Sequence, residues 1–118
     1  MTPLPLRTRR LPPPAHIVWD DLARPATTGP RVWLDLVDDE VPPRVLGGER
    51  PHRLVWSSLW PSRPKDRIDF ELTADGRDTR VAITLLAAGD PPDDETLRHL
   101  RHRLSELLWR DLRHSYGQ

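Results

Sequence analysis

The last quarter of the chain carries the pattern that most constrains the fold. From Asp90-Pro91-Pro92 to about His114, leucines recur at intervals of three and four residues, at positions 97, 100, 104, 107, 108 and 112. Residues at this spacing share one face of an α-helix, and on a wheel of about 100° per residue the six leucines span about 140°. A stripe of that width typically packs against a core. The pattern predicts one long C-terminal helix.

The residues before Ala88 alternate instead with the period of β-strands. Ile68, Phe70 and Leu72 alternate with charged residues, Ala74-Asp75-Gly76 supplies a turn, and residues 80–86 return, so a hairpin is expected here. Further elements are expected as strands at 4–11, 31–37, 45–46 (before a Gly47-Gly48 turn) and 53–60, and as a short helix at 14–23. Five or six antiparallel strands with a helix at each end predict an α+β fold.

Composition narrows the class of protein. The 118 residues suit a single domain, residues 1–118, with a core from about 6 to 114. The chain has no cysteine, so we expect neither disulfides nor thiolate chemistry. Basic and acidic residues number 18 each, and no apolar stretch approaches the roughly 20 residues that span a bilayer. We therefore expect a cytoplasmic protein with no nucleic-acid partner and no membrane insertion.

The chain carries no motif that is specific for one chemistry. It has no P-loop, dinucleotide-binding glycine pattern or EF-hand, and its serines lack a nucleophile setting, so no cofactor is expected and the catalytic residues stay unknown. His99, His102 and Glu106 have helical spacing that would suit a metal. On the wheel, however, they lie opposite the leucines with Arg103, Arg110 and Arg113. We expect a solvated charged face there, and no metal.

Aromatic side chains on the expected strands are candidates for a ligand surface. Trp33, Trp56, Trp60 and Phe70 could line one concave face, with Ser58 as their polar neighbour. Large rings with few polar groups are typical of an apolar ligand pocket. They are equally typical of a packed core. Both interpretations stay open for these residues.

Arg101 is a candidate of another kind, because it lies inside the leucine arc together with Asp111. A buried guanidinium needs an anion or carbonyl partner, so Arg101 could meet an acidic ligand or a pocket carboxylate. Alternatively, its stem packs on the sheet and its head reaches water. The candidate ligand-binding residues are therefore Trp33, Trp56, Ser58, Trp60, Phe70 and Arg101.

The order of the expected elements resembles the SRPBCC superfamily, the START, Bet v 1 and polyketide-cyclase-like group with the helix-grip fold. The similar parts are the Pro13–Leu22 segment, the Arg67–Val81 hairpin with its Asp-Gly turn, and the leucine-rich final helix. Together they extend from about Leu6 to Leu112. The chain is shorter than the usual form, and the second short helix of the full fold is missing.

The resemblance implies a curved antiparallel sheet of five to six strands wrapped around the long C-terminal helix, with a pocket between them. It implies binding of a small hydrophobic or amphipathic ligand in that cavity, by a monomer or homodimer. Two alternatives stay open. One is a polyketide cyclase- or hydrolase-like enzyme, with Arg101, Asp35, His52 or Ser58 as polar participants, and the other is a protein-interaction module like the chaperone activators.

Overall fold

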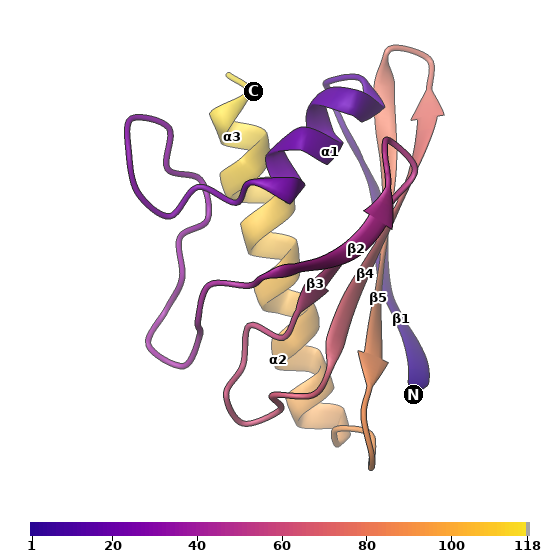
Figure 1. Ribbon diagram of the computed structural model, residues 1–118, viewed down its shortest axis with the longest axis vertical. Coiled ribbons are helices and arrows are strands. Elements are labelled where there is room, and N and C mark those ends of the chain that lie inside the picture. The colour runs from indigo at the N-terminus through magenta and orange to yellow at the C-terminus, as the bar shows by residue number, and fades with distance from the viewer. Residues whose placement is uncertain (118) are drawn as a thin grey trace.

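The protein is a five-stranded antiparallel sheet with helices on one face (Figure 1). The computed structural model describes residues 1–117. Strand order across the sheet is β1-β5-β4-β3-β2. The elements are β1 (Thr2–Leu11), α1 (Ala15–Ala23), β2 (Val45–Glu49), β3 (Arg53–Ser57), β4 (Arg67–Asp75), β5 (Asp78–Ala87), α2 (Asp94–Ser105), the π-helical η1 (Glu106–Leu112) and α3 (Arg113–Ser115). The last three form one continuous helix across the concave side of the sheet (Figure 1).

The α+β class, the helix-grip architecture and the long C-terminal helix are confirmed. The expected hairpin is also present, since β4 and β5 pair up to Asp75 opposite Asp78 and leave Gly76 and Arg77 as the loop. Gly76 has φ 62°, in the left-handed region that a residue without a Cβ adopts most easily. The helix begins where Asp93 accepts a hydrogen bond of 2.7 Å from the amide of Thr96, which caps an otherwise unpaired donor.

The strand expected at residues 31–37 is wrong, because that segment is an irregular loop. The amides of Trp33 and Leu34 both donate to the carbonyl of Ala26, at 3.0 and 3.1 Å, and this folds the chain back on itself. Both side chains are buried although they are consecutive, whereas a strand places consecutive side chains on opposite faces.

The turn expected at Gly47-Gly48 is also wrong, since both glycines lie within edge strand β2. A Cβ on Gly48 would lie 2.4 Å from the carbonyl oxygen of Arg53 on β3, so glycine is required there by close approach of two strands. The strand expected at residues 53–60 ends earlier, at Ser57.

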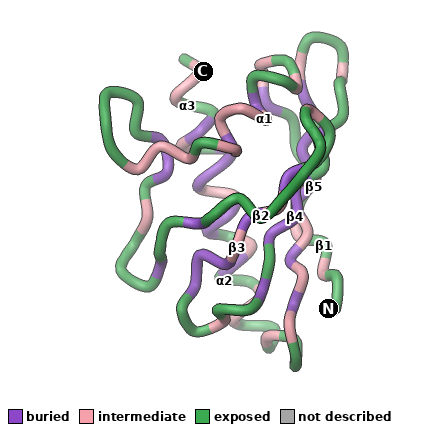
Figure 2. The backbone as a smooth tube through the Cα atoms, in the orientation of Figure 1, coloured by how far each residue is buried: buried purple, intermediate pink, exposed green. Residues whose placement is uncertain are grey.

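The core lies between the concave face of the sheet and the C-terminal helix (Figure 2). Five leucines of the predicted stripe are buried, and Leu97 packs at its margin. They meet buried side chains of β3, β4 and β5, including Trp56, Phe70 and Ile83. The aromatic rings therefore fill the space under the sheet.

Replacing a leucine of this stripe tests the placement of the helix. We expect Leu104→Ala to lower the free energy of unfolding by about 2 to 5 kcal/mol, because a fully buried side chain is lost and a void remains. Leu46→Ala is the control, since Leu46 is 43% exposed on β2, and it should change stability by less than about 0.5 kcal/mol. Urea denaturation measures both, and a neutral Leu104→Ala would contradict the placement.

Candidate functional site

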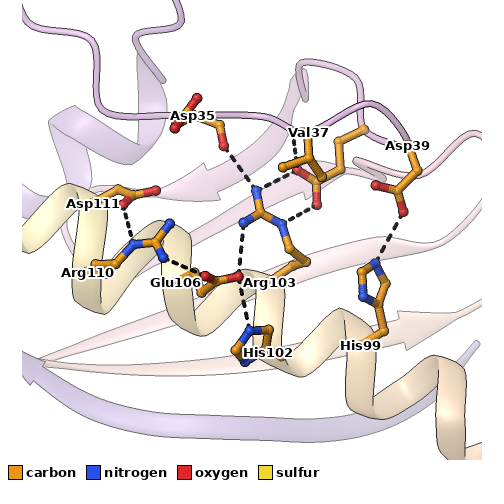
Figure 3. A network of polar contacts seen from close by, with 10 residues as sticks. Asp35, Val37, Asp39, His99, His102, Arg103, Glu106, Arg110 and Asp111 are labelled. Carbon is orange, nitrogen blue, oxygen red and sulfur yellow. Dashed lines mark hydrogen bonds and ion pairs between the residues drawn. The ribbon is translucent and has the colours of Figure 1, made fainter.

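A buried ion pair joins the irregular loop between α1 and β2, residues 24–44, to the C-terminal helix (Figure 3). Arg103 of α2 donates from Nε and Nη2 to the two carboxylate oxygens of Glu40, each at 2.8 Å. Arg103 Nη2 also donates to the carbonyl of Asp35 at 3.0 Å, and Glu40 Oε1 accepts from the amide of Val37 at 3.0 Å. Hydrogen bonding to Glu40 is the largest cause that raises the pKa of the Arg103 guanidinium. These hydrogen bonds fix the position of the loop along the helix.

This pair corrects the expected solvated face, because Arg103 is only 6% exposed. Of the three arginines on that side of the wheel, Arg103 lies nearest the leucine arc, and the loop containing Glu40 covers that flank of the helix. The more distant Arg110 and Arg113 are exposed as expected. A buried guanidinium with this many partners is a structural anchor for the loop.

Outside the anchor, the helix carries a chain of polar contacts (Figure 3). Glu106 accepts from Arg103 at 3.1 Å and from Arg110 at 2.6 Å, and it pairs with His102 at 3.2 Å. Burial opposes ionisation of Glu106, but the Arg103 hydrogen bond and the charges of Arg110 and His102 together hold its pKa below the ordinary range. His99 pairs instead with Asp39, at 3.2 Å. Among residues 1–117, no three His, Asp or Glu side chains gather in a way that could hold a metal ion.

The C-terminal helix changes from α to π winding at Glu106, three residues after Arg103. Segment η1 has the wider π form, in which each amide bonds to the carbonyl five residues before it. It buries the consecutive residues Leu107, Leu108 and Trp109. On an α-helix three consecutive residues span about 200°, whereas the wider turn advances less per residue and brings them toward one side. Short π segments frequently mark functional sites.

An open groove of about 700 Å³ lies between η1 and the irregular loop. We call it the tryptophan groove, and its lining residues are Val32, Trp33, Asp35, Trp109, Arg110, Asp111, Arg113 and His114. The ion pair of Arg103 and Glu40 lies beside it, since Asp35 lines the groove and its carbonyl oxygen accepts a hydrogen bond from Arg103. The buried ion pair therefore positions one wall of the groove against the other.

Three buried polar atoms of this groove's residues have no hydrogen-bond partner among residues 1–117. They are the indole Nε1 of Trp33, the indole Nε1 of Trp109 and Oδ2 of Asp111. The other carboxylate oxygen of Asp111 accepts from Arg110 at 2.8 Å. Buried polar atoms are nearly always paired in folded proteins. Two unpaired donors and one unpaired acceptor on residues that line one groove make it a candidate site, although the three atoms themselves are covered from solvent in this structure.

The expected aromatic set is divided between this groove and the core. Trp33 lines the groove and stacks on Trp56, with ring centroids 6.3 Å apart. Trp56 in turn meets Phe70 edge to face at 4.7 Å and donates its indole N–H to the carbonyl of Leu22 at 2.7 Å. Trp56 and Phe70 are fully buried, and neither lines the tryptophan groove. The three rings form a continuous stack from groove to core.

The other candidate residues lie elsewhere. Ser58 and Trp60 line a separate groove of about 230 Å³ beyond the end of β3, where the Ser58 hydroxyl bonds the Trp60 backbone. Arg101 is half-buried, its Nε has no partner among residues 1–117, and it lines neither groove. His52 lies in the β2–β3 turn and is likewise absent from the tryptophan groove, whereas Asp35 belongs to it.

Sequence reasoning missed Trp109 and Arg113 as groove residues, and it noted Asp111 only for its place in the leucine arc. One signal was present. Between Asp94 and His114, Trp109 is the single tryptophan, and this segment has no phenylalanine or tyrosine. Its burial depends on the π turn, which a helical wheel of constant pitch does not represent.

No protein-family model and no curated protein matches the chain. Among solved structures it is similar to the crystal structure of CalU16 from Micromonospora echinospora, with a TM-score of 0.61 and 16% sequence identity. The match covers 86% of this chain, which spans 66% of CalU16. At this identity the likeness shows the arrangement of the elements, the helix-grip fold, and nothing about the ligand. No helix within residues 1–117 has the length and apolar character needed to cross a membrane.

Breaking the anchor should be costly because it leaves one buried charge alone. We expect Arg103→Ala to lower the free energy of unfolding by about 3 to 5 kcal/mol. Arg110→Ala is the matched control, since it removes an exposed ion pair to the same Glu106, and it should cost less than about 1 kcal/mol. The double variant Glu40→Leu with Arg103→Met should recover part of the loss in urea denaturation. Equal effects of Arg103→Ala and Arg110→Ala would contradict the anchor.

Acid should weaken the contacts of Glu106. Its pKa in the folded protein lies below the ordinary value of 4.5, so the unfolded chain binds a proton first as pH falls. The stabilisation is complete above pH 4.5 and is lost as pH falls through the lower, folded pKa. We expect the stability difference between wild type and Glu106→Gln to shrink below pH 4.5 in denaturation series from pH 7 to 3. Glu71→Gln, at an exposed position of β4, is the control.

Proposed function

We propose that this protein binds a small amphipathic molecule in the tryptophan groove. The observation that carries the proposal is the pair of buried indole N–H groups, on Trp33 and Trp109, that have no partner within residues 1–117. An unmade hydrogen bond of this kind costs about 1 to 3 kcal/mol. Both N–H groups are covered from solvent, so a ligand oxygen would offset this cost once the side chains that cover them shift. The groove volume of about 700 Å³ falls within the range of small-molecule sites.

The groove replaces a cavity under the sheet as the favoured place for the ligand. Trp56 and Phe70 occupy the interior, where they contact each other at van der Waals range. Trp33 continues this stack outward, so its ring is held by packing before any ligand arrives. A pre-positioned aromatic wall with a few polar groups around it suits an apolar body that carries a hydrogen-bond acceptor.

The enzyme alternative finds less support in the geometry. The Ser58 hydroxyl is engaged with the backbone of Trp60, and neither Arg101 nor His52 lines the tryptophan groove. The protein-interaction alternative would use the sheet edge, where Val45 and Leu46 of β2 are exposed, or the loop surface with its exposed valines. Single exposed valines are common on soluble proteins and carry less weight than unpaired buried donors.

Calorimetric titration with neutral amides tests the proposal, with 2-naphthamide and decanamide as probes. We expect saturable binding that weakens about two- to tenfold in Trp33→Phe and in Trp109→Phe, because each change keeps a ring and removes one donor. Trp60→Phe is the control, since Trp60 also has an unpartnered buried indole but lies outside this groove. Absence of saturable binding would contradict the proposal and favour the interaction module. Equal weakening by Trp60→Phe would contradict the location.

A further inference from the structure

A second groove, of about 850 Å³, adjoins the first at the end of the helix. We call it the arginine groove, and its lining residues are Thr8, Arg9, Arg10, Leu11, Pro12, Asp75, Asp78, Arg80, Trp109 and Arg113. Trp109 and Arg113 line both grooves, so the two share a border at the junction of η1 and α3. Trp109 and Arg113 therefore lie at the border of the two grooves.

The charges of the arginine groove are unevenly paired. Arg10 lies 3.8 Å from Asp75 and 4.0 Å from Asp78, and Arg80 lies 3.5 Å from Asp75. Both carboxylates of the groove are thus engaged by these two arginines at the hairpin end. Within residues 1–117, neither Arg9 nor Arg113 has a carboxylate within 4.0 Å. Of the two arginines without a carboxylate partner within residues 1–117, Arg9 lies over the ring of Trp109, and Arg113 follows Trp109 by four residues in the helix.

The position of Arg9 follows from strand register. Arg9 pairs directly with Val81 of β5, so both side chains leave the same face of the sheet. Val81 is buried in the core, and Arg9 therefore extends over the helix-facing side. Its guanidinium carbon lies 5.7 Å from the ring centroid of Trp109, within cation–π range. The contact holds one cation at the border of the two grooves.

We infer that the ligand is a small aromatic acid whose carboxylate lies between Arg9 and Arg113. Its apolar body would lie against Trp33 and Trp109 in the tryptophan groove, so the inference rests on the proposed function and specifies its ligand class. Two unpaired arginines complement a carboxylate in charge and in donor geometry. Arg9 has an alternative role, because a charged residue on the inward face of an edge strand discourages pairing with other chains. That role does not explain Arg113, which lies on the helix.

Paired probes that differ in charge test the inference. We expect 2-naphthoate to bind the wild-type protein about tenfold more tightly than 2-naphthamide, with the difference shrinking as salt is raised. Arg9→Gln and Arg113→Gln should each weaken 2-naphthoate more than 2-naphthamide, so that the preference for the acid falls about two- to fivefold. Arg7→Gln is the matched control, since Arg7 is exposed on the same face of β1 and lines neither groove. Calorimetry gives all these affinities, and circular dichroism confirms that each variant folds.

The outcomes separate this inference from the proposed function. Equal affinity for the two probes would overturn the acid preference while leaving groove binding intact. A preference for 2-naphthoate that survives in the Arg9→Gln, Arg113→Gln double variant, or that Arg7→Gln reduces equally, would overturn the assigned residues. Failure of both probes to bind would overturn the proposed function, and the inference with it.

Discussion

The buried pair between Arg103 and Glu40 is the interaction on which the functional end of the molecule depends. Taking both charges out of water is expensive, and the cost is offset because the guanidinium also reaches the Asp35 carbonyl and Glu106, while Glu40 accepts from the Val37 amide. These bonds give a fixed position to a loop that has no strand or helix of its own. The main effect of the ion pair is therefore to position the loop that forms one wall of the tryptophan groove.

Buried side chains fill most of the space between the sheet and the C-terminal helix. Trp56 and Phe70 fill the concavity, and the row of rings continues through the buried Trp33 to the wall of the tryptophan groove. The two grooves lie instead near the end of the helix, where η1 winds more widely and Trp109 lines both of them. The likeness to CalU16 extends to the arrangement of the elements. The groove itself is built from this chain's loop and its π turn.

The leucine stripe and the β4–β5 hairpin could be predicted because each is a local periodicity in the sequence. The loop could not, since its shape depends on partners such as Glu40 and Arg103 that lie 63 residues apart. The contact between Glu40 and Arg103 also explains why the helical wheel predicted an exposed Arg103. A wheel shows only the directions of the side chains and not the segments that cover the helix. Of the six candidate ligand residues, Trp33 alone lines the tryptophan groove. It was grouped with the other aromatic residues because residues 31–37 were expected to be a strand, whereas this segment is a loop that positions Trp33 at the groove.

The most direct measurement is a ¹H–¹⁵N spectrum of the five indole N–H groups during titration with 2-naphthoate. Trp19 and Trp56 donate to the carbonyls of Arg53 and Leu22, so their signals should stay nearly constant and serve as internal references. The account predicts that the signals of Trp33 and Trp109 move together and saturate, because these are the unpaired donors of the groove. Unmoved signals for both residues, with shifts confined to the other tryptophans, would contradict it.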